Sequence, residues 1–190
     1  MKSVILLADG FETCEALITV DVLRRAGIKI DTVSIMGKEQ VISSHRIHME
    51  ADYAFQEVDM DTYDLIILPG GKLGTKNLEE YEPLAKAIEN HLAKDKPLAA
   101  ICAAPSILGK RGYLKGKKYT CFPSFDGEYG GFYQEELSVV DGNLITARGM
   151  GATLEFARNI VKFVLGEEAL DELDYGIQYE HRFKELKKGE

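Results

Sequence analysis

Four short apolar segments, each followed by turn residues and then by a helix-like pattern, constrain the fold of this 190-residue chain more than any other feature. Segments of this length, bounded by turn residues and rich in branched side chains, are typical of strands buried on both faces. Strands that alternate with helices predict a parallel sheet covered by helices on both sides. The predicted strands are Val4–Ala8, Lys29–Ile35, Leu65–Leu68 and Leu98–Cys102.

The segments between these strands have the apolar spacing of helices that pack on a sheet. The first predicted helix runs from Glu12 to Arg25, and Gly27 suits its C-terminal end. Its predicted buried stripe is Ala16, Leu17, Val20, Leu23 and Ala26. Further helices are predicted at residues 81–93, from residue 103 to 108 and at residues 153–165, with a hairpin between residues 137 and 147. The pairing of residues 40–49 stays open, and the tail from residue 167 to 190 is helical or partly frayed.

Composition narrows the class of protein. A net charge of −8 argues against nucleic acid or an anionic membrane as the main partner. Three cysteines, Cys14, Cys102 and Cys121, do not form the pattern of a secreted disulfide framework. The apolar start at residues 4–8 is too short for a signal peptide or a membrane span. We therefore expect a cytoplasmic protein, and the absence of repeats and linkers predicts one domain over residues 1–190.

Cys102 stands where a buried strand runs into a helix with almost no loop. Flanking alanines leave room for a tight turn of the nucleophile-elbow type, and Pro105 suits the first turn of a helix. The N-terminus of a helix stabilises a thiolate, so the position predicts a lowered pKa for Cys102. The alternative is an inert core cysteine, as most free cysteines are.

Two other strand ends bring complementary groups to the same edge of the sheet. Glu12 and Glu15 open the first helix, either as partners of the helix dipole or as proton carriers facing the thiol. The paired glycines Gly70 and Gly71 follow the third strand and allow backbone N–H groups to approach a ligand, although such a pair also marks an ordinary turn.

Five segments, taken in order, resemble the DJ-1/PfpI (ThiJ) superfamily, and specifically its DJ-1-like branch. The resemblance implies a flavodoxin-like three-layer sandwich with a mostly parallel sheet, related to the class I glutamine amidotransferase fold. It also implies links to glyoxalase and deglycase activity on α-oxoaldehydes, to chaperone activity and to the sensing of oxidative stress, without a cofactor. The matching segments are residues 8–15, 20–28, 68–71, 99–105 and 146–151.

By that resemblance Cys102 is the oxidation-prone nucleophile, and Glu15 is the protonated glutamate that hydrogen-bonds it. Gly71 lies in the loop whose backbone faces the sulfur. The resemblance also implies a homodimer through the first helix, around Val20 to Arg25, with Arg24 in the interface helix. Two-fold pairing is the commonest state of soluble oligomers.

Several functions use this thiol. In the first, Cys102 adds to a small aldehyde such as methylglyoxal, Glu15 moves the proton, and N–H groups near Gly71 and Ala103 hold the oxyanion. In the second, the protein is a redox-regulated chaperone or stress sensor whose cysteine oxidises to a sulfinate. A third possible function is thiazole monophosphate biosynthesis, which is the label (ThiJ) that some relatives carry. Ala103 argues against a peptidase, which carries histidine there. A glutamine amidotransferase needs a His-x-Glu pair after Cys102, and none precedes His181.

Other residues complete the candidate pocket. Either His45 or Arg46 stands where the family often places an arginine, and Phe122 replaces a histidine found in some members. His45 and His48 fall on opposite faces of an extended stretch, so no metal site is predicted. His91 and His181 are predicted to be solvated. Residues 148–151 are interpreted as a turn before the last helix rather than as a binding segment.

Overall fold

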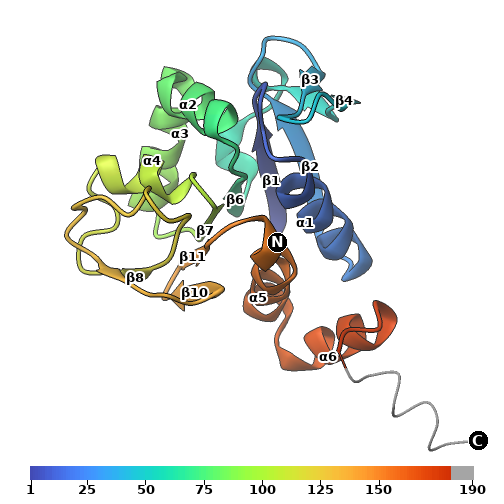
Figure 1. The fold of residues 1–190 in the computed structure, drawn as a ribbon. Helices are drawn as coiled ribbons and strands as arrows, with labels where there is room; N and C mark the ends of the chain where they lie inside the picture. Colours follow the sequence, from blue (N-terminus) through green and yellow to red (C-terminus); the bar gives the residue numbers. More distant parts are fainter. Residues whose placement is uncertain (181–190) are drawn as a thin grey trace, which may run out of the picture.

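The computed structural model of the protein describes residues 1–180. In this part of the chain, seven strands form the main sheet in the order β10-β11-β7-β6-β1-β2-β5 (Figure 1). All neighbouring pairs are parallel except β10 and β11, which form the antiparallel edge. The strands are β1 (Lys2–Leu7), β2 (Lys29–Ser34), β5 (Tyr53–Ala54), β6 (Leu65–Leu68), β7 (Leu98–Ile101), β10 (Ser138–Asp141) and β11 (Leu144–Ala147).

Helices cover both faces of this sheet, because alternate side chains of its central strands point to opposite sides. Ile5 and Leu7 of β1 join the core cluster beneath one helical layer, while Val4 and Leu6 join the cluster beneath the other. The first layer consists of α1 (Thr13–Arg25), α5 (Thr153–Leu165) and α6 (Glu167–Gly176), and the second of α2 (Lys72–Glu80), α3 (Glu82–Ala93) and α4 (Pro105–Lys110). The predicted α/β sandwich with a mostly parallel sheet is confirmed.

Local structure departs from the sequence prediction at four points. Strand β7 ends at Ile101, one residue early, because Cys102 has a φ of 65° that a strand does not allow. Helix α4 starts at Pro105 instead of residue 103. Helix α2 was not predicted, since Gly74 and its polar neighbours lack a clear apolar stripe. Leu17, predicted to be buried, is 39% exposed on the outer face of α1.

Residues 40–50, whose pairing the sequence left open, form an antiparallel hairpin of β3 (Gln40–Ile42) and β4 (His48–Glu50). Its turn is attached to the loop after β1, because Ser44 N–H donates to the Phe11 carbonyl at 2.8 Å. The remaining short elements are β8 (Lys118–Tyr119), β9 (Phe132–Tyr133) and the 3₁₀ turns η1 (Phe55–Glu57), η2 (Met60–Thr62) and η3 (Met150–Ala152). The predicted hairpin near residue 141 is present as β10 and β11.

The histidine predictions need correction. His91 was predicted to be solvated, but it is 4% exposed and its Nε2–H donates to the Pro97 carbonyl at 2.8 Å. Burial lowers the pKa of His91. His45 lies in the hairpin turn, not in an extended stretch shared with His48. His181 and the rest of the predicted tail lie outside the described residues. Within residues 1–180, no helix is long and apolar enough to cross a membrane.

Candidate functional site

Three loops meet at the C-terminal ends of the adjacent strands β1, β6 and β7. The chain passes from β1 to β2 on one side and places β6 on the other, so the strand order reverses beside β1. Ligands of open α/β sheets bind at such a reversal, outside the carboxyl ends of the strands. The loops after β1 and β6 are joined there, because Glu12 N–H donates to the Gly70 carbonyl at 3.0 Å.

Cys102 occupies the turn between β7 and α4 with a φ of 65°, a conformation that non-glycine residues rarely adopt. Its backbone is fixed from both sides. Cys102 N–H donates to the Ala147 carbonyl at 2.8 Å, and Phe122 N–H donates to the Cys102 carbonyl at 2.7 Å. A strained turn that directs one side chain away from the strand is the geometry of a nucleophile elbow. Cys102 is half-buried.

Glu15 lies in the first turn of α1 and is completely buried. Its Oε2 accepts a hydrogen bond from Gly70 N–H at 2.8 Å, the carboxyl interacts with the Cys102 thiol, and Oε1 is buried without a hydrogen-bond partner. Burial raises the pKa of Glu15 from 4.5 to about 7, and the charge of Glu12 adds to the effect. Because no donor reaches Oε1, the charged carboxylate is disfavoured, which agrees with the raised pKa of Glu15.

Cys102 and Glu15 titrate as a pair, because two negative charges in one buried site repel each other. Burial, followed by the charge of Glu15, raises the pKa of Cys102 to about 12, whereas the N–H groups of Gly71 and Ala103 lower it. The predicted low pKa of Cys102 is therefore wrong for the pair with an ionised Glu15. Protonation of Glu15 removes the repulsion that its charge exerts on a thiolate at Cys102.

The backbone groups predicted to face the sulfur do so. The N–H groups of Gly71 and Ala103 both hydrogen-bond the Cys102 side chain. Gly71 has a φ of 90°, and a side chain there would collide with the Gly10 carbonyl. Glycine at residue 71 therefore lets the loop after β6 pack closely against the loop after β1.

Glu12 has a different place from Glu15. It is the N-cap of α1, and its Oε2 accepts a hydrogen bond from Glu15 N–H at 2.8 Å. Such a cap satisfies a free N–H of the first turn. Of the two glutamates, Glu15 interacts with the thiol, and Glu12 holds the turn from which Glu15 projects.

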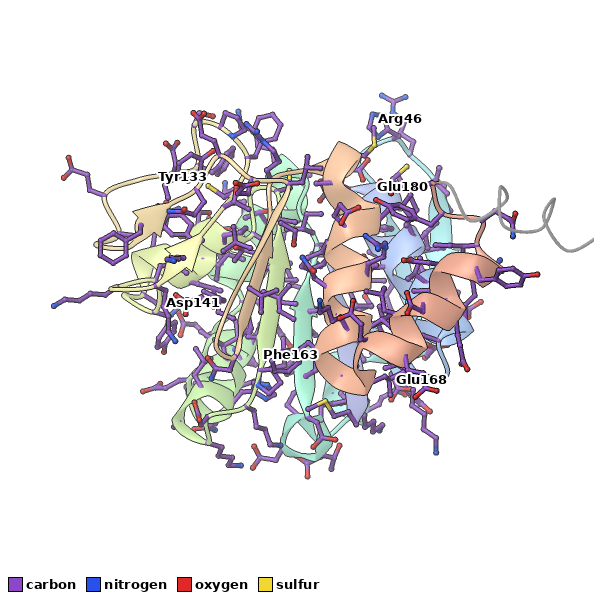
Figure 2. All side chains as sticks on the ribbon, turned by 90° about the horizontal axis from the view of Figure 1, so that it is seen from below. Arg46, Tyr133, Asp141, Phe163, Glu168 and Glu180 are labelled. Carbon is purple, nitrogen blue, oxygen red and sulfur yellow. The ribbon has the colours of Figure 1, made fainter. Side chains whose placement is uncertain are left out.

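The other predicted pocket residues lie in two exposed segments. His45 and Arg46 are exposed in the turn of the β3–β4 hairpin, and Figure 2 shows Arg46 projecting outward from the surface. Neither side chain hydrogen-bonds Cys102 or Glu15 within the described residues, so the choice between them stays open. Phe122 is 47% exposed and adjoins the elbow through its backbone N–H.

Two further residues of the site act through their backbone, and the sequence indicated Gly70, as one of the paired glycines, but not Ala147. Gly70 supplies the N–H that binds Glu15, and a Cβ there would lie 2.5 Å from Cys102 Cβ and 2.6 Å from Glu15 Oε2. The paired glycines after β6 were a usable signal for it. Ala147 orients the elbow through its carbonyl, and no side-chain pattern reports a backbone acceptor of this kind.

Comparison with known proteins agrees with this fold. The family model described as "DJ-1/PfpI family" matches residues 1–163. The protein dj-1beta of Drosophila melanogaster is 35% identical over 179 residues, 93% of this chain and 96% of its own. A deglycase of Thermococcus kodakarensis is 32% identical over 168 residues, 86% of this chain and 99% of its own. A DJ-1 superfamily protein from Salmonella typhimurium has a TM-score of 0.89 at 34% identity, covering 95% of this chain and 100% of that one.

The sheet order and the cysteine at a strained strand-to-helix turn define an α/β protein with a nucleophile elbow. Within that class, the chain belongs to the DJ-1/PfpI family, and it resembles DJ-1-like members over most of its length.

Proposed function

We propose that this protein is a cofactor-independent enzyme that acts on α-oxoaldehydes such as methylglyoxal, in the manner of a glyoxalase or deglycase. The observation that carries the proposal is the Cys102–Glu15 pair: a strained cysteine at a φ of 65° beside a buried carboxyl with a pKa of about 7. A carboxyl that titrates near neutral pH suits general acid–base catalysis. A deglycase among the relatives supports the proposed reaction class.

In the first step, the Cys102 thiolate adds to the aldehyde carbon while Glu15 holds the shared proton. The new C–S bond places negative charge on the former aldehyde oxygen. The N–H groups of Gly71 and Ala103 hydrogen-bond the sulfur in the free protein, and in the adduct they would donate to that oxygen. Protonation of the oxygen by Glu15 gives a hemithioacetal and leaves a carboxylate.

In the second step, the Glu15 carboxylate removes the proton from the sulfur-bearing carbon and returns it to the neighbouring carbonyl carbon, while the hydroxyl proton of the hemithioacetal passes to the oxygen of that carbonyl. The product is a 2-hydroxyacyl thioester of Cys102, formed without any change in overall oxidation state. Water then cleaves the thioester, which frees the thiol and releases the 2-hydroxy acid, lactate in the case of methylglyoxal.

The test is conversion of methylglyoxal to lactate without glutathione, by the wild type and by Cys102→Ser. We expect lactate from the wild type and at least a hundredfold lower rate from the variant, since serine is not ionised at neutral pH. Cys14→Ser and Cys121→Ser serve as matched controls and keep the rate. Equal lactate formation by wild type and Cys102→Ser would reject the proposal.

A second candidate, a redox sensor or chaperone, uses the same half-exposed sulfur. A protonated Glu15 can donate a hydrogen bond to a cysteine sulfinate, which would make oxidation at Cys102 a stable signal. A reducing cytoplasm suits both functions, because it returns the thiol to its active form. The site residues offer no support for the thiazole alternative.

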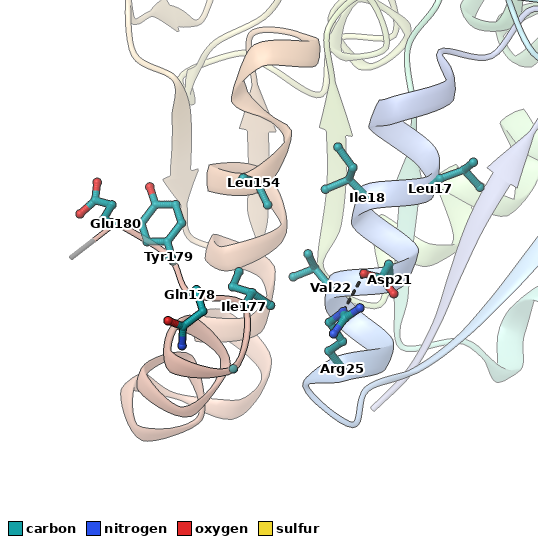
Figure 3. A pocket seen from close by; sticks show the side chains of 11 residues that line it. Leu17, Ile18, Asp21, Val22, Arg25, Leu154, Ile177, Gln178, Tyr179 and Glu180 are labelled. Atoms are coloured by element: carbon teal, nitrogen blue, oxygen red, sulfur yellow. Dashed lines mark hydrogen bonds and ion pairs between the residues drawn. The ribbon is translucent and has the colours of Figure 1, made fainter. Parts of the chain in front are cut away.

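We further propose a homodimer through α1. The outer face of this helix carries Leu17 and Ile18, together with the Asp21–Arg25 ion pair, and borders a groove of about 750 Å³. Figure 3 shows the groove between α1 on one side and Leu154 with residues 177–180 on the other. An apolar strip with one acid and one base is self-complementary under a two-fold axis. Arg24 is less available, because it pairs with Asp52 at 2.8 Å.

A further inference from the structure

A groove of about 470 Å³ lies beside the elbow, and none of the steps above uses it. We call it the Arg148 groove. Small-molecule sites fall in this size range. Its lining includes Phe122, Leu137, Arg148, Gly149, Met150 and Gly151.

The groove adjoins the backbone of Cys102 on two sides. Phe122, in one wall, donates its N–H to the Cys102 carbonyl at 2.7 Å. Arg148, in the other, directly follows Ala147, whose carbonyl accepts the Cys102 N–H at 2.8 Å. A group bound here would therefore lie beside the backbone of the residue proposed as the nucleophile.

Its apolar walls are open to solvent. Phe122, Leu137 and Met150 are 47%, 52% and 56% exposed, and they gather around the same groove. Scattered exposed apolar side chains are ordinary, but a group of them around one concavity is typical of a binding surface. An apolar part of a ligand would gain burial from these walls.

Arg148 is the one cationic residue of this lining in the described chain. It is half-buried, and within residues 1–180 no carboxylate pairs with its guanidinium, whereas Arg24, Arg25 and Arg158 each have a carboxylate partner. In a protein of net charge −8, an arginine left without a partner in an apolar groove is complementary to an anion.

The turn that contains Arg148 does not depend on its side chain. The backbone N–H of Arg148 donates to the Leu137 carbonyl at 3.0 Å, and Thr153 Oγ1 donates to the Met150 carbonyl at 2.7 Å. Backbone contacts of this kind account for the turn predicted from the sequence. They leave the guanidinium available for a ligand.

We propose that the Arg148 groove binds the non-reacting part of the substrate and selects α-oxoaldehydes whose apolar group carries a carboxylate. This inference rests on the proposed function for its reaction, while binding in the groove can be measured without turnover. The apolar group would lie against Phe122 and Met150, and the carboxylate would pair with Arg148.

Binding is tested with 4-methylbenzoate, an apolar carboxylate without an aldehyde, and with its uncharged counterpart 4-methylbenzamide. We expect the wild type to bind the carboxylate about tenfold more tightly than the amide, and Arg148→Met to lose this preference. Arg148→Lys keeps part of it. Lys86→Met, which removes an exposed charge on α3 outside the groove, keeps all of it.

A second variant tests the location. A Cβ at Gly151 meets no atom within 4 Å, so Gly151→Phe places a ring at the groove without a clash at the backbone. We expect this variant to bind neither compound while it melts at the wild-type temperature. Unchanged binding by Gly151→Phe, or equal carboxylate preference in the wild type and Arg148→Met, would overturn the proposal.

Turnover gives an independent readout. Initial rates with 4-carboxyphenylglyoxal should exceed those with phenylglyoxal about tenfold in kcat/KM, mainly through KM, and Arg148→Met should remove the difference. Equal kcat/KM for both compounds in the wild type would also overturn the proposal. If the wild type converts no aldehyde, the proposed function fails, and the binding experiment alone decides whether the groove takes carboxylates.

Discussion

Gly70 N–H donates a 2.8 Å hydrogen bond to Glu15 Oε2, which joins the helix after β1 to the loop after β6. This contact holds the buried carboxyl next to the sulfur of Cys102, which comes from a third loop. The chemistry proposed here depends on how closely these three residues approach one another.

Replacement of Gly70 by alanine should disturb that approach. A methyl group at this position would lie 2.5 Å from Cys102 Cβ and 2.6 Å from Glu15 Oε2, closer than atoms pack. We expect Gly70→Ala to lower methylglyoxal turnover at least tenfold and to lower the melting temperature. Gly176→Ala, where an added Cβ meets nothing within 4 Å, is the control. Full activity in Gly70→Ala would show that the pair tolerates displacement.

Glu15→Gln should separate the charge of Glu15 from its place in the fold. Glutamine keeps an oxygen for Gly70 N–H but carries no negative charge, so we expect the pKa of Cys102 to fall below its value of about 12. If Glu15 served only as a hydrogen-bond donor to the thiolate, its replacement would raise the pKa of Cys102 instead. Turnover should fall about a hundredfold, because the proton carrier is lost. The pKa is followed by thiolate absorbance, with Glu12→Gln as the control; an increase in the pKa would contradict the pairing described here.

The raised pKa of Glu15 predicts how stability depends on pH. Burial raises this pKa from 4.5 to about 7, so the folded state binds the proton more tightly than the unfolded state. The resulting stabilisation is fully present below pH 4.5 and is lost as the pH rises through about 7, a change of about 3 kcal/mol. Urea unfolding of the wild type and Glu15→Gln at several pH values measures it. A constant difference between the two proteins from pH 4.5 to 7.5 would contradict the assignment.

Oxidation should select Cys102 among the three thiols. Its side chain is half-buried in the described structure, whereas Cys121 is fully buried. Because the thiolate is the form that reacts, we expect the rate of oxidation by limiting peroxide to rise with pH. Peptide mass spectrometry identifies the modified residue. Earlier oxidation of Cys14, which is also half-buried, would remove the special status of Cys102.

The proposed dimer makes Leu17 the most informative position on α1. This side chain is 39% exposed and borders the groove of Figure 3, so Leu17→Lys removes apolar contact area without disturbing the core. We expect the wild type to sediment at about twice the 21.1 kDa chain mass and the variant to dissociate at micromolar concentration. Lys76→Ala on α2 is the surface control. A monomeric wild type, or a dimer unaffected by Leu17→Lys, would place any interface elsewhere.

Much of this protein follows from its sequence alone. The apolar segments and the helical spacing between them determine the alternating α/β order, since strands buried on both faces need helices on both sides. The junction at Cys102 and the glutamates after β1 predicted which residues come to one edge of the sheet. These predictions work because they depend on local patterns and on the rule that parallel strands end at the same edge.

Only the tertiary structure decided what these residues do to one another. The sequence treated Glu12 and Glu15 alike, but folding makes Glu12 a helix cap and buries Glu15 against Cys102. It also reverses the expected pKa of Cys102, because burial and a neighbouring carboxylate outweigh two backbone N–H groups. Burial and charge proximity depend on contacts between residues far apart in the chain, such as Glu15 and Gly70, and no local pattern encodes them.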